Sequence, residues 1–192
     1  MNLAIVDLAY GNIGSIQFAF ERLGVSPTLT ADPEQIARAE RVLLPGVGAA
    51  GHAMQRIDEL GLRECLRSLT QPALGICLGM QLLFERSEED DTQCLGLVPG
   101  AVRTLEPAAG MPVPHMGWSK LSVSRPELGI RSGDYAYFAH SFACDVGSAT
   151  VASVEYGREI PAALRQGNWW GAQFHPERSG DAGARFLAAF LG

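Results

Sequence analysis

The stretch PALGICLGMQ, residues 72–81, places a cysteine between a short apolar run and a helical pattern. Residues 72–77 predict a buried strand, and residues 79–87 (GMQLLFERS) predict the helix that follows it. Gly75 and Gly79 stand two positions before and after Cys77, which is the G-x-S-x-G spacing of a nucleophile elbow with cysteine in place of serine. In such a turn the glycines avoid a collision, and the helix N-terminus favours a thiolate. The alternative is a buried core cysteine beside glycines that pack helices.

Strands and helices alternate through the first half of the chain. The helical stripe at residues 12–24 is formed by Ile13, Ile16, Phe20 and Leu23. Further strands are predicted at residues 2–7, 25–30 and 41–45, and further helices at residues 31–39 and around Met54, Ile57 and Leu60. Apolar strands that alternate with such helices indicate a parallel sheet covered on both faces.

The second half of the chain reads differently. Strand-like runs separated by Gly, Pro and Ser turns occupy residues 95–107, 120–125, 135–144, 149–157, 161–167 and 168–177, and a final helix is predicted at residues 183–192. We therefore expect an α/β fold with an open, mostly parallel sheet flanked by helices and extended by an antiparallel portion. The length of 192 residues fits one domain, residues 1–192.

Composition excludes several classes of function. The net charge is −6 and Lys120 is the single lysine, so we expect no nucleic-acid partner. No apolar run approaches the ~18 residues of a membrane span, and the start of the chain lacks a basic segment, so neither membrane association nor a signal peptide is predicted. The four cysteines form no C-x-x-C pair, which favours free thiols and a cytoplasmic location. We also expect no cofactor and no metal, because the four histidines show no ligand spacing.

A thiol nucleophile needs a base, and the base needs a group that orients it. His175 and Glu177, in the stretch AQFHPE, follow an apolar strand and are linked by a stiff proline. Partners of this kind meet in the fold rather than in the sequence. The sequence therefore predicts a Cys77–His175–Glu177 triad, with a solvated His–Glu pair on a loop as the alternative.

The loop PGVGAAG, residues 45–51, spells the dinucleotide-binding pattern with Gly46, Gly48 and Gly51. The acidic residue expected at the end of the next strand is missing, because Cys77 stands there. In a parallel sheet this loop lies beside Cys77, so we expect the Leu78 and Val47 N–H groups to form an oxyanion hole. The glycines on both sides of Val47 suggest that its peptide rotates when a partner binds.

The other histidines rank lower as catalytic groups. His52 is expected to be exposed on the helix after the glycine loop. His115 and His140 lie in apolar surroundings, where a hydrogen-bonded structural role is the alternative to a functional one.

Six motifs extend the pattern over nearly the whole chain: YGNIGS (10–15), LPGVGA (44–49), GICLGMQ (75–81), HMGW (115–118), YFAHSF (137–142) and QFHPERSG (173–180). Together they resemble the class I, triad-type glutamine amidotransferases, whose sheet is flavodoxin-like. Among these, the motifs are similar to the glutaminase subunits of imidazole glycerol phosphate synthases in histidine biosynthesis.

The resemblance implies hydrolysis of L-glutamine to glutamate and ammonia through a thioester at Cys77. It implies that Gly46, Gly48 and Gln81, with the backbone of His140, Ser141 and Phe142, line the glutamine. It also implies a heterodimer with a (βα)8-barrel cyclase subunit that receives the ammonia through a sheltered path.

The candidates for the partner surface or the ammonia exit are Tyr10, Asn12, His115, Met116 and Trp118, with core packing as the alternative for each. Four positions depart from the family pattern: Ala9, Ser119, Phe142 and Arg178. Two other functions stay open, which are the glutaminase of another synthase and a non-catalytic dinucleotide-binding module. A peptidase-like cysteine hydrolase fits less well, because there a histidine commonly follows the cysteine, where this chain has Leu78.

Overall fold

The computed structural model describes residues 1–9, 13–46 and 48–192, so the predictions for Tyr10, Asn12 and Val47 fall outside the described residues. The first half contains β1 (Leu3–Val6), α1 (Ile13–Arg22), β2 (Thr28–Thr30), α2 (Pro33–Arg38), β3 (Arg41–Leu44), α3 (Ala50–Glu59), α4 (Arg63–Arg67), β4 (Ala73–Ile76) and α5 (Leu78–Gln81). The second half contains β5 (Arg86–Ser87), the 3₁₀ turn η1 (Glu89–Asp91), β6 (Thr92–Gln93), β7 (Ala101–Thr104), β8 (His115–Lys120), β9 (Ser122–Val123), η2 (Pro126–Leu128), β10 (Tyr135–His140), β11 (Phe142–Cys144), β12 (Thr150–Glu155), β13 (Glu159–Gln166), β14 (Trp169–Ala172), η3 (Pro176–Arg178) and α6 (Gly180–Leu191).

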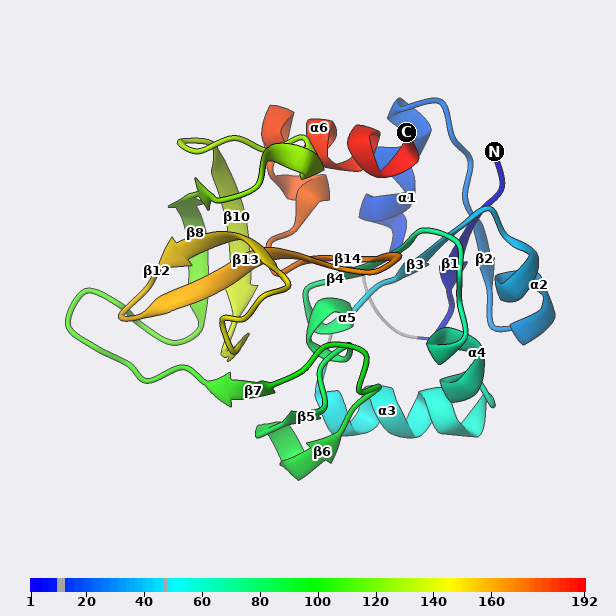
Figure 1. The fold of residues 1–192 in the computed structure, drawn as a ribbon, viewed down its shortest axis with the longest axis horizontal. Coiled ribbons are helices and arrows are strands. Elements are labelled where there is room, and N and C mark those ends of the chain that lie inside the picture. The colour runs from blue at the N-terminus through cyan, green and yellow to red at the C-terminus, as the bar shows by residue number, and fades with distance from the viewer. Residues whose placement is uncertain (10–12, 47) are drawn as a thin grey trace.

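Eight strands form the main sheet in the described part of the chain, in the order β2-β1-β3-β4-β14-β13-β12-β9. The strands from β2 to β14 are parallel, and β13, β12 and β9 continue the sheet in antiparallel fashion. The predicted open α/β sheet with an antiparallel portion is therefore confirmed (Figure 1).

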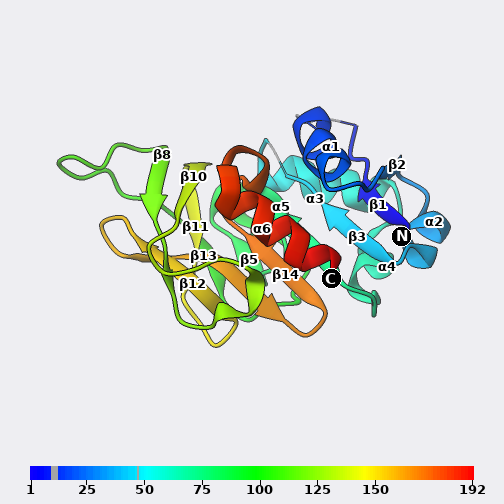
Figure 2. The same cartoon turned by 90° about the horizontal axis from the view of Figure 1, so that it is seen from above.

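Helices cover both faces of the parallel region, with α1 and α6 on one face and α3 on the other (Figures 1 and 2). Side chains of β1 alternate between the two cores. Leu3 and Ile5 belong to the cluster that contains Phe20 of α1, whereas Ala4 and Val6 belong to the cluster beneath α3. Two-sided burial explains why this strand is a continuous apolar run rather than an alternating one.

Two smaller sheets stand beside the antiparallel end. In one, β8 pairs with β10, with His115 opposite His140. In the other, the strand order is β11-β7-β5-β6. β10 and β11 are separated only by Ser141, so the single strand predicted for residues 135–144 is divided between two sheets. The strand predicted for residues 120–125 is divided in the same way, between β8 and β9.

The helix predicted for residues 79–87 is wrong in length, because α5 ends at Gln81. The carbonyls of Leu82, Leu83 and Phe84 accept hydrogen bonds from backbone N–H groups of residues 95–98. A helix would need those carbonyls for its own next turn. The apolar pattern of this segment therefore arises because it is buried against a loop, and not because it forms one face of a helix.

Three glycines let β3 and β4 approach α5 closely. A Cβ atom on Gly46 would overlap the Gly79 nitrogen, and one on Gly79 would overlap the Leu44 carbonyl oxygen. A Cβ atom on Gly75 would lie 2.5 Å from the Gly79 carbonyl oxygen. The spacing of Gly75 and Gly79 around Cys77 is thus required by backbone packing.

None of the helices in the described ranges is long and apolar enough to cross a membrane.

Gly79→Ala is expected to lower the free energy of unfolding by about 1–3 kcal/mol or more, because the added methyl group meets rigid backbone. Gly14→Ala provides the matched control. Gly14 lies in α1, and a Cβ atom there would have no neighbour within 4 Å, so alanine is expected to stabilise the helix by about 0.5–1 kcal/mol. Urea unfolding of both variants measures the difference, and equal stabilities would contradict the close-approach argument.

Candidate active site

A cavity of about 470 Å³ opens at the carboxyl ends of β3 and β4, where the loop after β14 and the start of β11 also meet. Of the site residues that the sequence predicts, the following line it: Gly46, Gly48, Cys77, Leu78, Gln81, Met116, His140, Ser141, Phe142, His175 and Glu177. The topology therefore gathers residues from both halves of the chain in one pocket. Its size falls within the range of about 300–1,000 Å³ that is usual for small-molecule sites.

Cys77 occupies the sharp turn between β4 and α5. Its backbone has φ 53° and ψ −113°, a strained conformation for a residue with a side chain. Its N–H donates to the Ala172 carbonyl at 2.7 Å, which fixes the turn to the end of β14. The thiol sulfur lies 3.8 Å from Nε2 of Gln173 and 4.0 Å from the Ala139 carbonyl. Leu78, the residue whose N–H is predicted to stabilise an oxyanion, follows directly in the pocket wall.

The stretch after β14 holds the predicted base. Nδ1 of His175 lies 2.9 Å from Oε1 of Glu177. The backbone N–H of His175 donates to the Tyr137 carbonyl at 2.9 Å. The buried Ser179 hydroxyl donates to the backbone carbonyl of His175 at 2.7 Å. The backbone on both sides of the imidazole is therefore anchored to β10.

The electrostatic surroundings of His175 favour its protonated form. Burial alone would lower the pKa of this imidazole, but hydrogen bonds with Cys77 and Glu177 raise it to about 10. Glu177 is also buried, with 9% of its side chain exposed, and its Oε2 has no hydrogen-bond partner among the described residues. Hydrogen bonds with Cys77 and Glu177 thus favour a proton on His175.

Two glutamine side chains meet beside the cavity: Gln81 lines it, and Gln173 is buried behind Gln81. Nε2 of Gln81 donates to the Phe142 carbonyl at 2.8 Å and to Oε1 of Gln173 at 2.9 Å. Sequence analysis assigned no role to Gln173, which is fully buried. The signal was present, because Gln173 alternates with His175 and Glu177 along the chain.

Glu89 lines the cavity and was also missed by sequence analysis. Its Oε2 accepts a hydrogen bond from the Ala50 N–H at the start of α3, at 2.8 Å. Burial raises the pKa of this carboxyl group, and the nearby Asp90 adds to the shift. The surrounding run EEDD, residues 88–91, looks like a solvated acidic segment in the sequence, which hid the one member that faces the cavity.

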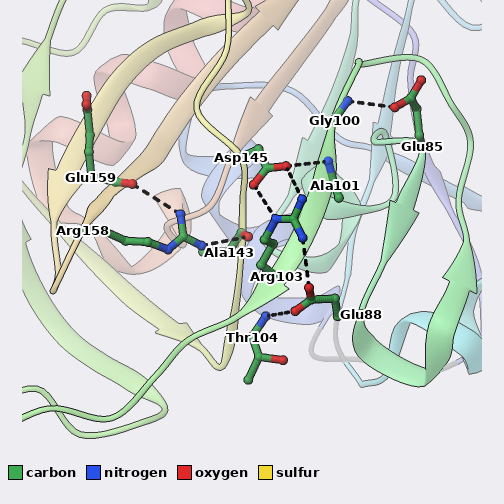
Figure 3. Close-up of polar contacts among 10 residues, drawn as sticks. All are labelled: Glu85, Glu88, Gly100, Ala101, Arg103, Thr104, Ala143, Asp145, Arg158 and Glu159. Carbon is green, nitrogen blue, oxygen red and sulfur yellow. Dashed lines mark hydrogen bonds and ion pairs between the residues drawn. The ribbon is translucent and has the colours of Figure 1, made fainter.

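Arg103 on β7 connects the segment that follows β11 with the segment that carries Glu89 (Figure 3). Its guanidinium contacts Oδ1 of Asp145 at 3.0 Å and Oε1 of Glu88 at 3.1 Å. Glu88 also accepts the Thr104 N–H at 2.9 Å, and it directly precedes Glu89. Exposed ion pairs of this kind add little stability, so their contribution is to the geometry of β5, β7 and β11.

The described candidates for a partner surface differ in how exposed they are. His115 is 2% exposed, so its prediction as a surface contact is wrong, and its side chain is hydrogen-bonded to His140 and Ser119. Met116 and Trp118 are 64% and 55% exposed, so the core-packing alternative is wrong for both. Met116 also lines the cavity, whereas Trp118 lies beside Tyr137.

The structure gives one glycine of the loop a packing role. Gly46 is packed against α5, so its lack of a side chain has a steric reason that is independent of peptide rotation at Val47. Gly48 has φ +88°, a conformation that glycine adopts readily. Within the described ranges, no group of three or more His, Cys, Asp or Glu side chains is arranged to hold a metal ion.

Comparison with known proteins identifies similar proteins whose names agree with one another. The family "Glutamine amidotransferase class-I" matches residues 4–191. A protein of Idiomarina loihiensis named "Imidazole glycerol phosphate synthase subunit HisH" is 50% identical over 192 residues, which is 100% of this chain and 97% of that protein. A protein of Xanthomonas euvesicatoria with the same name is 49% identical over 193 residues, covering 99% of this chain and 96% of that protein.

Solved structures agree on the fold. A crystal structure described as a glutamine amidotransferase superposes with a TM-score of 0.78 at 20% identity, covering 100% of this chain and 97% of that one. A glutamine amidotransferase from Thermotoga maritima gives a TM-score of 0.67 at 18% identity, covering 100% of this chain and 82% of that one.

His175 is expected to carry a proton at about pH 8, because its pKa is raised to about 10. Cys77→Ala removes one of the groups that favour the imidazolium, so the pKa should fall toward or below the ordinary value of about 6.5. The stabilisation from this proton is complete below about pH 6.5 and is lost as the pH rises through about 10.

NMR titration of the histidine rings measures this difference. His115 and His140 are internal controls, because burial lowers their pKa values to about 4 and about 3, and they should stay neutral. The same His175 pKa in both proteins would contradict the coupling to Cys77.

Proposed function

The chain belongs to the class-I glutamine amidotransferase family, and from this premise we propose that it is the glutaminase subunit of an imidazole glycerol phosphate synthase. We take residues 1–192 as one amidotransferase domain. The protein would hydrolyse L-glutamine to glutamate and ammonia and pass the ammonia to a (βα)8-barrel cyclase subunit in histidine biosynthesis. Full-length identity of about 50% to proteins named as this subunit supports the proposal.

The observation that carries the proposal is the meeting of Cys77 with the His175–Glu177 pair in one cavity. A strained cysteine turn, a histidine that interacts with it and a buried carboxylate that orients the histidine are the parts of a thiol nucleophile. The dinucleotide-binding alternative gains no comparable support, because Gly46 is explained by its packing against α5.

Acylation begins with the proton already on His175, as its raised pKa favours, and with Cys77 as the thiolate. The sulfur attacks the side-chain amide carbon of glutamine, and the carbonyl oxygen gains a negative charge. The Leu78 N–H, with Val47 proposed as the second donor, stabilises that oxyanion, and each donor contributes about 3–4 kcal/mol to the transition state. His175 then donates its proton to the departing nitrogen, the C–N bond breaks, and ammonia leaves a thioester on Cys77.

Deacylation reuses the same groups. His175 removes a proton from water, the hydroxide attacks the thioester carbon, and the C–S bond breaks to give glutamate. Breaking this bond restores the Cys77 thiolate beside the protonated His175. Glu177 keeps Nδ1 of the ring protonated throughout, so Nε2 is the atom that accepts and returns protons.

The pocket also contains groups suited to the amino-acid end of the substrate. Glu89 supplies a carboxylate whose partner in the structure is a backbone N–H, so it has acceptor capacity for the α-ammonium group. The backbone of His140, Ser141 and Phe142, with Gly46, Gly48 and Gln81, would line the rest of the substrate.

The exposed side chains of Met116 and Trp118 are proposed to contact the cyclase, together with Tyr10 and Asn12. Met116 reaches both the cavity and the surface, which suits a position near the ammonia exit. All four described cysteines are free thiols, which fits a cytoplasmic enzyme.

The central test mixes the chain with the barrel cyclase and its ligand and measures glutamate release. Release by the isolated chain should be low and should rise on mixing. Cys77→Ala should lower the rate in the complex by on the order of 10³-fold or more, because the nucleophile is lost. Binding of the variant to the cyclase, measured by calorimetry, should be unchanged.

Cys65→Ala is the matched control, because this half-buried thiol lies outside the cavity and contacts the Pro33 carbonyl. It should keep the wild-type rate. Activity of Cys77→Ala close to that of wild type would refute the mechanism, and fast release by the isolated chain would refute activation by the partner.

Glu89→Gln is expected to raise the KM for glutamine by about tenfold to a hundredfold, with a smaller change in kcat, because a charged hydrogen bond to the α-ammonium is lost. The glutamine oxygen can still accept the Ala50 N–H, so the start of α3 is preserved. Asp91→Asn, at an exposed position in the same turn, removes a neighbouring negative charge and should leave KM unchanged. Equal effects of the two substitutions would argue for a general charge effect instead.

A further inference from the structure

Two buried histidines face each other beneath the pocket wall. His115 on β8 and His140 on β10 are paired across the antiparallel strands and are 2% and 5% exposed. Nδ1 of His115 lies 3.0 Å from Nε2 of His140. The outer nitrogens are also engaged, since Nε2 of His115 lies 2.8 Å from the Ser119 hydroxyl and Nδ1 of His140 lies 2.8 Å from the Phe142 carbonyl.

These contacts fix the position of every proton in the series of hydrogen bonds. A carbonyl oxygen only accepts, so Nδ1 of His140 must carry its proton and donate to Phe142. Burial lowers the pKa of both rings, so each is neutral near pH 7 and has one donor and one acceptor. Nε2 of His140 therefore accepts from Nδ1–H of His115, and Nε2 of His115 accepts from the Ser119 hydroxyl.

The rings have little freedom to leave these positions. The His115 ring stacks between Tyr156, at a centroid distance of 3.9 Å, and Phe138, at 4.8 Å. Burying an imidazole requires a hydrogen-bond partner at both ring nitrogens, and these contacts provide one for each. An imidazole can accept at one edge and donate at the other, which is what this series of donors requires.

The inner end of the series is the Phe142 carbonyl, which lies at the junction of the two small sheets. The same oxygen accepts a hydrogen bond from Gln81 at 2.8 Å, and Gln81 in turn contacts Gln173 beside the Cys77 sulfur. Two donors thus hold one backbone carbonyl, and it belongs to Phe142, a residue that lines the cavity.

We propose that His115 and His140 are positioning residues that, with Ser119 as the outermost donor, fix the Phe142 carbonyl and so shape the glutamine-binding wall. This inference rests on the proposed glutaminase function. The outer end of the series is on β8, the strand that also carries the exposed Met116 and Trp118.

Glutamine kinetics in the complex with the cyclase provide the first test. Ser119→Ala removes the outer donor and should raise KM by about threefold to tenfold, the factor expected for one hydrogen bond, with a smaller change in kcat. Ser119→Thr keeps a hydroxyl and should restore the wild-type KM. Ser122→Ala, at an exposed serine on β9, should have no effect.

His115→Phe keeps the stacked ring but removes both nitrogens, and it should raise KM further than Ser119→Ala. If this variant does not fold, the comparison of alanine with threonine at residue 119 still decides the question. An active wild-type complex with the same KM for Ser119→Ala, Ser119→Thr and Ser122→Ala would overturn the inference and leave the glutaminase proposal intact. A wild-type complex that releases no glutamate would overturn the function itself.

The second test needs no activity. In the isolated chain with ¹⁵N-labelled histidine, NMR near pH 7 should show both His115 and His140 as neutral rings with the proton on Nδ1. A proton on Nε2 of either ring, or a charged ring, would overturn the proposed series of donors. A structural histidine without these contacts has no reason to show this tautomer in both rings.

Discussion

The close approach of α5 to the ends of β3 and β4 is the constraint on which the site depends. Side chains at Gly46 or Gly79 would overlap backbone atoms, so the turn at Cys77 is possible only with glycine at these positions. The contact forces Cys77 into a positive φ and holds its sulfur at the edge of the parallel sheet. Because β14 pairs with β4, the loop that follows β14 carries His175 to the same edge. One steric contact thus determines where both reacting groups lie.

Burial strengthens the interaction between His175 and Glu177, but it also carries a desolvation penalty. Moving a carboxylate out of water is unfavourable unless it is paired, and Oε1 of Glu177 is paired with the ring at 2.9 Å. The same low exposure would disfavour a charged imidazole, yet hydrogen bonds with Cys77 and Glu177 outweigh it. The proton therefore stays near the sulfur, where both halves of the proposed reaction need it. The hydrogen bonds that join the His175 backbone to Tyr137 and Ser179 prevent the pair from relaxing toward solvent.

Sequence patterns predicted the parts of the fold that depend on local chemistry. Glycine spacing around Cys77, the alternation of strands and helices, and the strand-terminal His175 all follow from short-range rules. The length of α5 did not, because the carbonyls of Leu82 to Phe84 bond to a loop ten or more residues away. Gln173 and Glu89 were not predicted for a related reason. A polar residue in an apolar strand, or one acidic residue within an acidic run, can be given a role only when its surroundings in the folded chain are known. His115 was predicted as a partner contact from the HMGW motif, but its side chain lies on the opposite side of β8 from the exposed Met116.

In the proposed mechanism, the antiparallel half makes a reactive cysteine selective. The elbow and the histidine are proposed to carry out nucleophilic attack, and residues of β8, β10 and β11 line the cavity beside them. The break at Ser141 sends the chain from one small sheet to the other, and His140, Ser141 and Phe142 line the cavity at this point. These residues can position a substrate accurately only if their backbone is held in place, and the Phe142 carbonyl is held by Gln81 and His140. The parallel sheet therefore supplies reactivity, and the added strands supply the geometry that directs it.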